Sequence, residues 1–93
     1  MHIELEQLTD QERDLLKAAR GNGGQLALFA KADTRGPAVR TKLRAFHDPH
    51  NRDVAGQYIE ALHHLVEMQL LRSETREQFQ LTNHGWELGR KVN

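Results

Sequence analysis

Basic side chains that could contact phosphate groups are concentrated in the middle of this 93-residue chain. Residues 31–52 carry six Lys and Arg against two Asp and Glu, although the thirteen Lys and Arg of the whole chain balance thirteen Asp and Glu. Such cations neutralise nucleic-acid phosphates and position a protein without reading base sequence. The candidate phosphate contacts, here and nearer the C-terminus, are Arg40, Lys42, Arg44, Arg52, Arg72 and Arg76.

These basic residues also have a purely structural interpretation. Lys and Arg on an edge strand block edge-to-edge association, which would account for the alternating cations of residues 40–44. Arg52 could pair with Asp48 or Asp53 and brace the start of a helix. The two interpretations differ in one respect, because phosphate binding requires the cations of residues 40–44 and 72–76 to form one continuous surface.

Histidines and carboxylates offer a second kind of chemistry, metal binding. Glu60, His64 and Glu67 share one face of a predicted helix, so three ligands could converge there. The neighbouring His63 would point about 100° away from His64 on that helix. The HxxH spacing of residues 47–50 lies in a proline-containing loop, and no HExxH motif is present. We therefore expect solvated or locally hydrogen-bonded histidines and no metal site.

The sequence holds no pattern typical of an enzyme. The glycine-rich run GNGG, residues 21–24, lacks the Lys-Ser/Thr that completes a phosphate-binding loop. No nucleophile motif is present, and a chain this small is not expected to form a catalytic cleft. We expect a non-enzymatic protein with no cofactor and no small-molecule substrate.

Length and composition indicate one small domain of modest stability, which dimerisation would supplement. The chain has no cysteine, which excludes disulfides and thiolate metal sites. No apolar run approaches the roughly 20 residues that span a bilayer. The acidic N-terminus also lacks the apolar stretch of a signal peptide. We expect a cytoplasmic protein without membrane association.

The first elements that must position these side chains are a helix and a strand. Thr9 and Glu12 have the spacing of a capping box, which predicts a helix over residues 10–20. Gly21 could take the left-handed position at its C-terminal end. The apolar run of residues 25–30 is bounded by turn signals and predicts a strand.

Residues 38–46 fit two kinds of secondary structure. The residues expected to point inward along a strand are Val39, Thr41, Leu43 and Ala45. A helix is the rival, because Val39, Leu43 and Phe46 are spaced i, i+4 and i+7. We favour a hairpin with the preceding strand, joined by the turn DTRGP of residues 33–37, because the basic residues then fall on one face.

The second half of the chain predicts a long helix, a hairpin and a closing helix. After a loop over 47–53, residues 53–69 carry an apolar stripe of helical period, formed by Val54, Tyr58, Ile59, Leu62, Leu65 and Val66. Residues 70–72 and 78–81 predict two short strands joined by the loop SETRE. Thr82 is a suitable N-cap for a final helix through Val92, anchored by Trp86.

These features resemble the winged-helix class of helix-turn-helix proteins. A C-terminal pattern of that class, L-x-x-x-x-L-[LI]-x…[FY]-x-L-T-x-x-G, is matched by Leu65, Leu70, Leu71, Phe79, Leu81, Thr82 and Gly85. A pattern of small bacterial modules with a hairpin after the first helix is matched by Val39, Thr41, Phe46, Arg52, Ala55, Tyr58, Ala61, Leu62, Leu65 and Val66. The resemblance, covering about two thirds of the chain, implies a long helix entering the major groove and a wing contacting the backbone.

The exposed face of the long helix fits DNA poorly. Its residues are expected to be Gln57, Glu60, His64 and Glu67. Gln57 and His64 could contact bases, but a helix face with two carboxylates and no Lys or Arg is repelled by phosphates. The acidic face of Glu60, His64 and Glu67 would instead suit a protein partner with a basic surface, which is the alternative function.

The sequence thus predicts an α+β fold, a winged helix with three helices, an extra β-hairpin after the first helix, and a C-terminal wing followed by a short helix. Residues 1–93 would form one domain, with residues 1–8 as an arm or a disordered tail. The leading function is double-stranded DNA binding and transcription regulation through phosphate contacts. We also expect a homodimer formed by the terminal segments MHIELEQL and WELGRKV.

Overall fold

The computed structural model of the chain describes residues 5–29, 38–42, 45–46 and 51–92. Within these residues it is an α+β structure with three α-helices and a five-stranded antiparallel sheet, which confirms the predicted mixed class. A 3₁₀ turn, η1 (Leu5–Gln7), precedes the rest. The elements that follow are α1 (Asp10–Gly21), β1 (Gln25–Phe29), β2 (Ala38–Arg40), β3 (Ala45–Phe46), α2 (Arg52–Glu67), β4 (Leu71–Ser73), β5 (Gln78–Leu81) and α3 (Asn83–Lys91).

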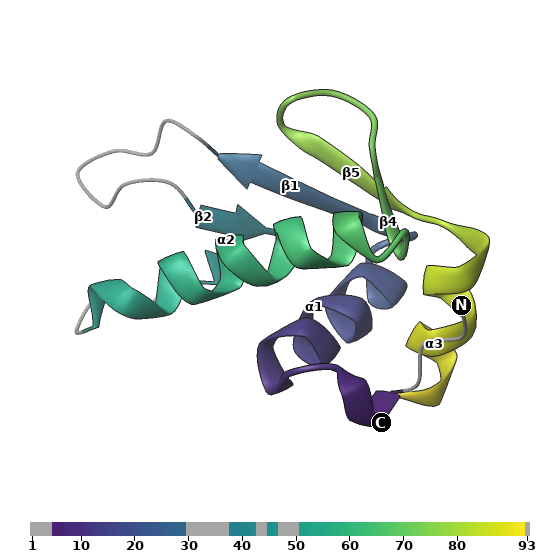
Figure 1. Ribbon diagram of the computed structural model, residues 1–93. Coiled ribbons are helices and arrows are strands. Elements are labelled where there is room, and N and C mark those ends of the chain that lie inside the picture. The colour runs from purple at the N-terminus through teal and green to yellow at the C-terminus, as the bar shows by residue number, and fades with distance from the viewer. Residues whose placement is uncertain (1–4, 30–37, 43–44, 47–50, 93) are drawn as a thin grey trace.

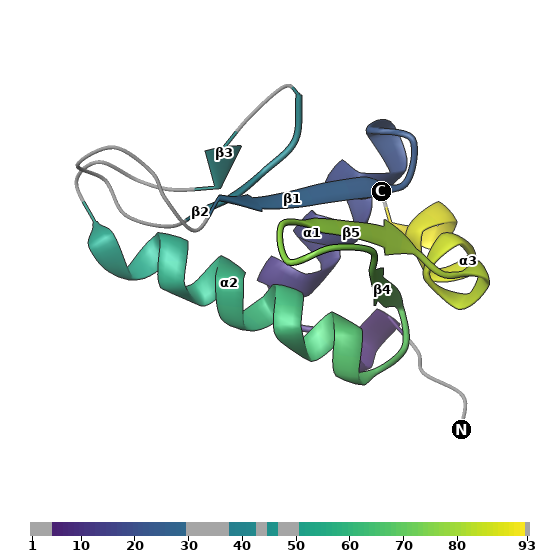
Figure 2. The same cartoon turned by 90° about the horizontal axis from the view of Figure 1, so that it is seen from above.

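The helices and the sheet form two layers. The strand order is β3-β2-β1-β5-β4, so β1 occupies the centre and pairs with β2 on one side and β5 on the other. Figure 1 shows the sheet above α1 and α2, and Figure 2 looks down on the opposite face, which no described element covers. The described residues between α1 and α2 form strands and no helix, unlike a helix-turn-helix.

The core lies between the layers and is built from leucines. The fully buried residues include Leu15 and Leu16 of α1, Leu62 and Leu65 of α2, Leu26 of β1 and Val39 of β2. Phe79 and Leu81 of β5 and Leu88 of α3 close the same core. The predicted stripe of α2 is therefore confirmed in part: Leu62 and Leu65 are buried, and Tyr58, Ile59 and Val66 pack at the margin of the core.

Both long helices end with a residue of positive φ and a hydrogen bond that closes six residues; in α1 the amide of Gly24 donates to the carbonyl of Ala19 at 2.7 Å. At the end of α2 the amide of Leu70 donates to the carbonyl of Leu65 and that of Gln69 donates to Val66, with Gln69 at φ +64°. This motif stops α2 at Glu67, two residues before its predicted end. In α1 the left-handed position belongs to Gly23, at φ +68°, and not to Gly21 as predicted. The predicted capping box between Thr9 and Glu12 is confirmed.

The prediction for residues 38–46 was only half right. A strand is present and pairs with β1, but it ends at Arg40 and the chain returns as β3. Because Val39 pairs with Phe46 and Arg40 with Ala45, Phe46 is buried and Ala45 is exposed. The prediction that Ala45 points inward is therefore wrong, since the turn resets the alternation. The predicted turn at 33–37 lies outside the described residues.

The closing segment follows the prediction closely. Strand β5 has the predicted bounds, and β4 is shifted by one residue. The Thr82 hydroxyl accepts from the amide of Gly85 at 3.0 Å and donates to the carbonyl of Gln69 at 2.6 Å. Trp86 is half-buried and packs against the core, as expected.

Candidate nucleic-acid interface

The strand registers decide which side chains lie on the uncovered face of the sheet. Gln25 pairs with Gln80, which in turn pairs with Arg72. Ala27 pairs with Arg40 on one side and Gln78 on the other. Because paired residues point to the same side of a sheet and Leu26 and Phe79 point into the core, these residues form two adjacent rows on the other side. We call this surface the open face; it consists of Gln25, Ala27, Arg40, Arg72, Gln78 and Gln80.

A shallow hollow lies over the open face. Its polar lining combines the amides of the central strands with residues from the turns around them, namely Asn22, Gln25, Arg40, Thr41, Lys42, Glu74, Gln78 and Gln80. Among these residues two are cations and one is an acid. The hollow is therefore a polar basin with a basic border on its β2 side.

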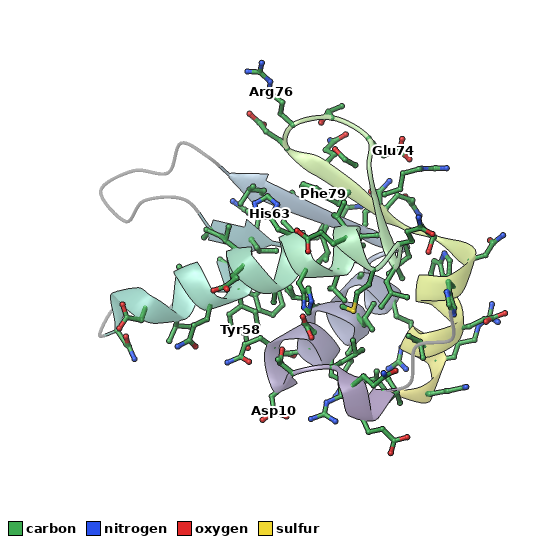
Figure 3. The ribbon with its side chains drawn as sticks, viewed as in Figure 1. Asp10, Tyr58, His63, Glu74, Arg76 and Phe79 are labelled. Atoms are coloured by element: carbon green, nitrogen blue, oxygen red, sulfur yellow. The ribbon has the colours of Figure 1, made fainter. Side chains whose placement is uncertain are left out.

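The cations of β2 and β4 lie on one surface. Arg40 and Arg72 are both exposed and lie on strands separated by three strand spacings, or about 14 Å. Arg72 donates to the carboxylate of Glu74 at 2.8 Å, which lowers its availability to an outside anion. Arg76 lies in the loop between β4 and β5 and projects away from the body of the protein (Figure 3). Arg40 of β2 and Arg72 of β4 thus lie on the same side of the sheet, with the side-chain amides of β1 and β5 between them.

Two of the predicted phosphate contacts cannot be placed. Arg44 lies outside the described residues, and Arg52 is the first residue of α2, with no described side chain. Lys42 follows β2 and borders the hollow, although it is not part of the strand that the sequence predicted.

The two predicted base contacts of α2 face another helix. The amide of Gln57 accepts from Gln11 of α1 at 3.3 Å, and Nδ1 of His64 contacts Oε2 of Glu12. Glu60 and Glu67 are exposed on the same wall of this groove between α1 and α2. The groove is acidic, so the face of α2 that was expected to enter DNA is the least suitable surface for it.

Sequence reasoning missed the role of Glu12. Glu12 is 1% exposed, and its carboxylate accepts from the amide of Thr9 while also contacting His64. The capping-box spacing predicted the first interaction. The second joins residues 52 positions apart, and no local pattern could have indicated it.

The described part of the chain has no residue cluster typical of a metal site and no membrane-spanning helix. No group of three His, Asp or Glu side chains there is placed to hold a metal ion. None of the described helices is long and apolar enough to cross a bilayer.

No protein-family model, curated protein or solved structure matches the chain. The open face and the acidic groove must therefore be interpreted from their own geometry.

Proposed function

We propose that the protein is a non-enzymatic winged-helix module that binds DNA and regulates transcription through phosphate contacts. The observation that carries this proposal is the placement of Arg40 and Arg72 on one uncovered face, with Lys42 at its border. Cations gathered on one surface can meet a phosphate backbone together, whereas cations spread over a neutral protein cannot. The exposed Arg76 extends the same basic character to the β4–β5 loop.

The winged-helix assignment is supported by the order of the elements and by the motif that joins β5 to α3. A hairpin follows the long helix α2, and its second strand pairs with β1 before α3 begins. The L-T-x-x-G motif has a clear physical role, because Thr82 caps α3 and Gly85 fits against the backbone of Leu70. In this proposal the sheet contacts DNA and α2 does not.

The test is fluorescence anisotropy of a labelled random-sequence DNA duplex, measured as the salt concentration rises. With about four phosphate contacts, the log–log slope should be between about −3 and −4. The variants Lys42→Glu, Arg72→Glu and Arg76→Glu should each weaken binding and reduce the slope by about one. Arg90→Glu is the matched control, because Arg90 is an exposed cation of α3 away from the open face. Equal affinity of all four variants would refute the proposal.

A second candidate function is recognition of a protein partner by the acidic face of α2. The observation in its favour is that Glu60 and Glu67 are exposed side by side with the half-exposed His64. A lysine-rich peptide should then bind the protein and lose affinity when Glu60→Gln and Glu67→Gln are combined. This function would take precedence if the protein bound no duplex at low salt.

A homodimer remains our expectation from the small size of the chain. Leu5 and Val92 are both half-buried and lie around one surface depression, so both ends of the described chain offer apolar area there. Sedimentation equilibrium should give twice the monomer mass. Leu5→Asp should shift the protein to the monomer.

A further inference from the structure

The side-chain amides at the centre of the open face have no hydrogen-bond partner among the described residues. Gln25 and Gln80 are direct cross-strand neighbours, and Gln78 lies on the adjacent row. Within the described residues, none of these three side-chain amides makes a hydrogen bond. By contrast, the side chain of Asn22 is held in place by donating to the carbonyl of Gln25 at 2.9 Å. Three amides thus present unused donors and acceptors to the hollow.

The chemistry of the hollow fits an anionic ridge. Its amides are neutral donors, and the cations Arg40 and Lys42 border it on the β2 side. Phosphate oxygens in protein–DNA complexes accept hydrogen bonds from Asn and Gln as well as from Arg and Lys. A concave surface with donors at its centre and cations at its border is complementary to a sugar–phosphate backbone.

The lining also distinguishes paired from unpaired nucleic acid. Single strands are held mainly by aromatic rings on which unpaired bases stack. The aromatic residue that lines the hollow, Phe79, is 5% exposed and lies on the helix side of the sheet (Figure 3). Trp86 packs over Gly24, outside the residues that line the hollow. The residues that line the hollow therefore offer hydrogen bonds and charge, and no exposed aromatic ring is among them.

Building on the proposed function, we infer that the hollow binds the sugar–phosphate ridge of double-stranded DNA without regard to base sequence. The amides of Gln25, Gln78 and Gln80 donate to phosphate oxygens, and the flanking cations supply the salt-dependent part of the affinity. We take duplex DNA as the ligand because the proposed function is transcription regulation, which acts on duplex DNA. The duplex is recognised by the shape and charge of its backbone.

The experiment replaces the amides without changing the charge. The triple variant Gln25→Met/Gln78→Met/Gln80→Met should bind the random-sequence duplex about tenfold or more weakly, because each lost hydrogen bond weakens binding several-fold. The salt slope should stay at the wild-type value, since no cation is removed. The matched control is Gln57→Met, which changes an exposed amide in the groove between α1 and α2 and should leave the affinity unchanged.

A second readout comes from the single tryptophan. Trp86 Cζ2 and Gln80 Nε2 each lie 2.6 Å from the point that a Cβ on Gly24 would occupy, so the ring is adjacent to this amide. Occupation of the hollow should change the tryptophan emission in step with the anisotropy. Unchanged emission at saturation would place the DNA elsewhere and overturn the inference.

The remaining outcomes separate the inference from the function on which it rests. Normal duplex affinity of the triple methionine variant overturns the role of the hollow but leaves the proposed function standing. Tighter binding of a single strand or an RNA duplex of the same sequence overturns the assignment to double-stranded DNA. Absence of binding to any nucleic acid at low salt overturns both the inference and the proposed function.

Discussion

The two ends of the protein are held together in different ways. Where α3 meets the turn between α2 and β4, backbone lies against backbone: a Cβ on Gly85 would overlap the carbonyl oxygen of Leu70. Where α2 begins, at the other end of Figure 1, side chains make the contacts. Tyr58 packs against Phe46 with ring centroids 4.8 Å apart, and its hydroxyl donates to the carboxylate of Asp14 at 2.6 Å. Figure 3 shows Tyr58 between α2 and α1.

The two ends therefore differ in whether a glycine can be replaced by a larger residue. Gly85 is buried and has no room for a methyl group. Gly56, on an exposed face of α2, has nothing within 4 Å of a built Cβ. The same substitution should therefore have opposite effects at the two ends.

The largest effect is expected for Gly85→Ala. The added methyl group meets the rigid backbone at Leu70, so α3 must move away from the turn between α2 and β4. Overpacking against backbone should lower the free energy of unfolding by about 3 kcal/mol. Urea denaturation followed by circular dichroism measures this change. A loss below about 1 kcal/mol would mean that α3 is not fixed by backbone contact.

A smaller loss is expected for Tyr58→Phe. The ring contact with Phe46 is kept, while the hydrogen bond to the Asp14 carboxylate is removed. Hydrogen bonds to charged groups contribute about 1.5 kcal/mol or more to stability, and this site is half-buried. The same denaturation experiment should show a loss of about 1.5 kcal/mol. An unchanged midpoint would show that the ring alone fastens α2 to α1 and β3.

Gly56→Ala should change stability in the opposite direction. Alanine is more favourable than glycine in a helix by about 0.5–1 kcal/mol, and here no neighbour is displaced. A rise of that size in the free energy of unfolding would sharpen the contrast with Gly85. A decrease would reveal a close neighbour at the start of α2.

The smallest effect on stability is expected at the basic border of the open face. Lys42→Gln and Arg76→Gln change exposed side chains, so each should alter the free energy of unfolding by less than about 0.5 kcal/mol. The same variants should reduce the salt slope of DNA binding. Aggregation of the Lys42 variant, with an unchanged salt slope, would instead support the structural interpretation of that cation.

Local signals predicted the parts of the fold that depend on neighbouring residues. The cap at Thr9, the strand at residues 78–81 and the cap at Thr82 follow from residue types a few positions apart. The turn that reverses the alternation before Ala45 was missed, because Val39 and Phe46 are brought together by strand pairing. Val39 and Phe46 are only seven positions apart, but residues 41–44 hold no Gly, Pro, Asn or Asp that would mark a tight turn.

The sequence pointed to the cations of the candidate site but not to its side-chain amides. Phosphate binding is usually inferred from cations, and this reasoning selected Arg40, Lys42 and Arg72. The spacing of Gln78 and Gln80 was visible, but a two-residue interval becomes meaningful only when the exposed side of the sheet is known. The contact of Gln57 with α1 likewise depends on how two helices pack, so the expected DNA-reading face of α2 could not be recognised as part of a groove.

The central position of β1 has a consequence for how the chain reaches its structure. Strand β1 forms in the first third of the chain, yet one of its two partners is β5, with Gln25 paired to Gln80. Arg20 likewise reaches across to the carbonyls of Gly89 and Val92. Pairings between distant residues slow folding, because a long loop must close first. During synthesis, one edge of β1 therefore stays unpaired until β5 has left the ribosome.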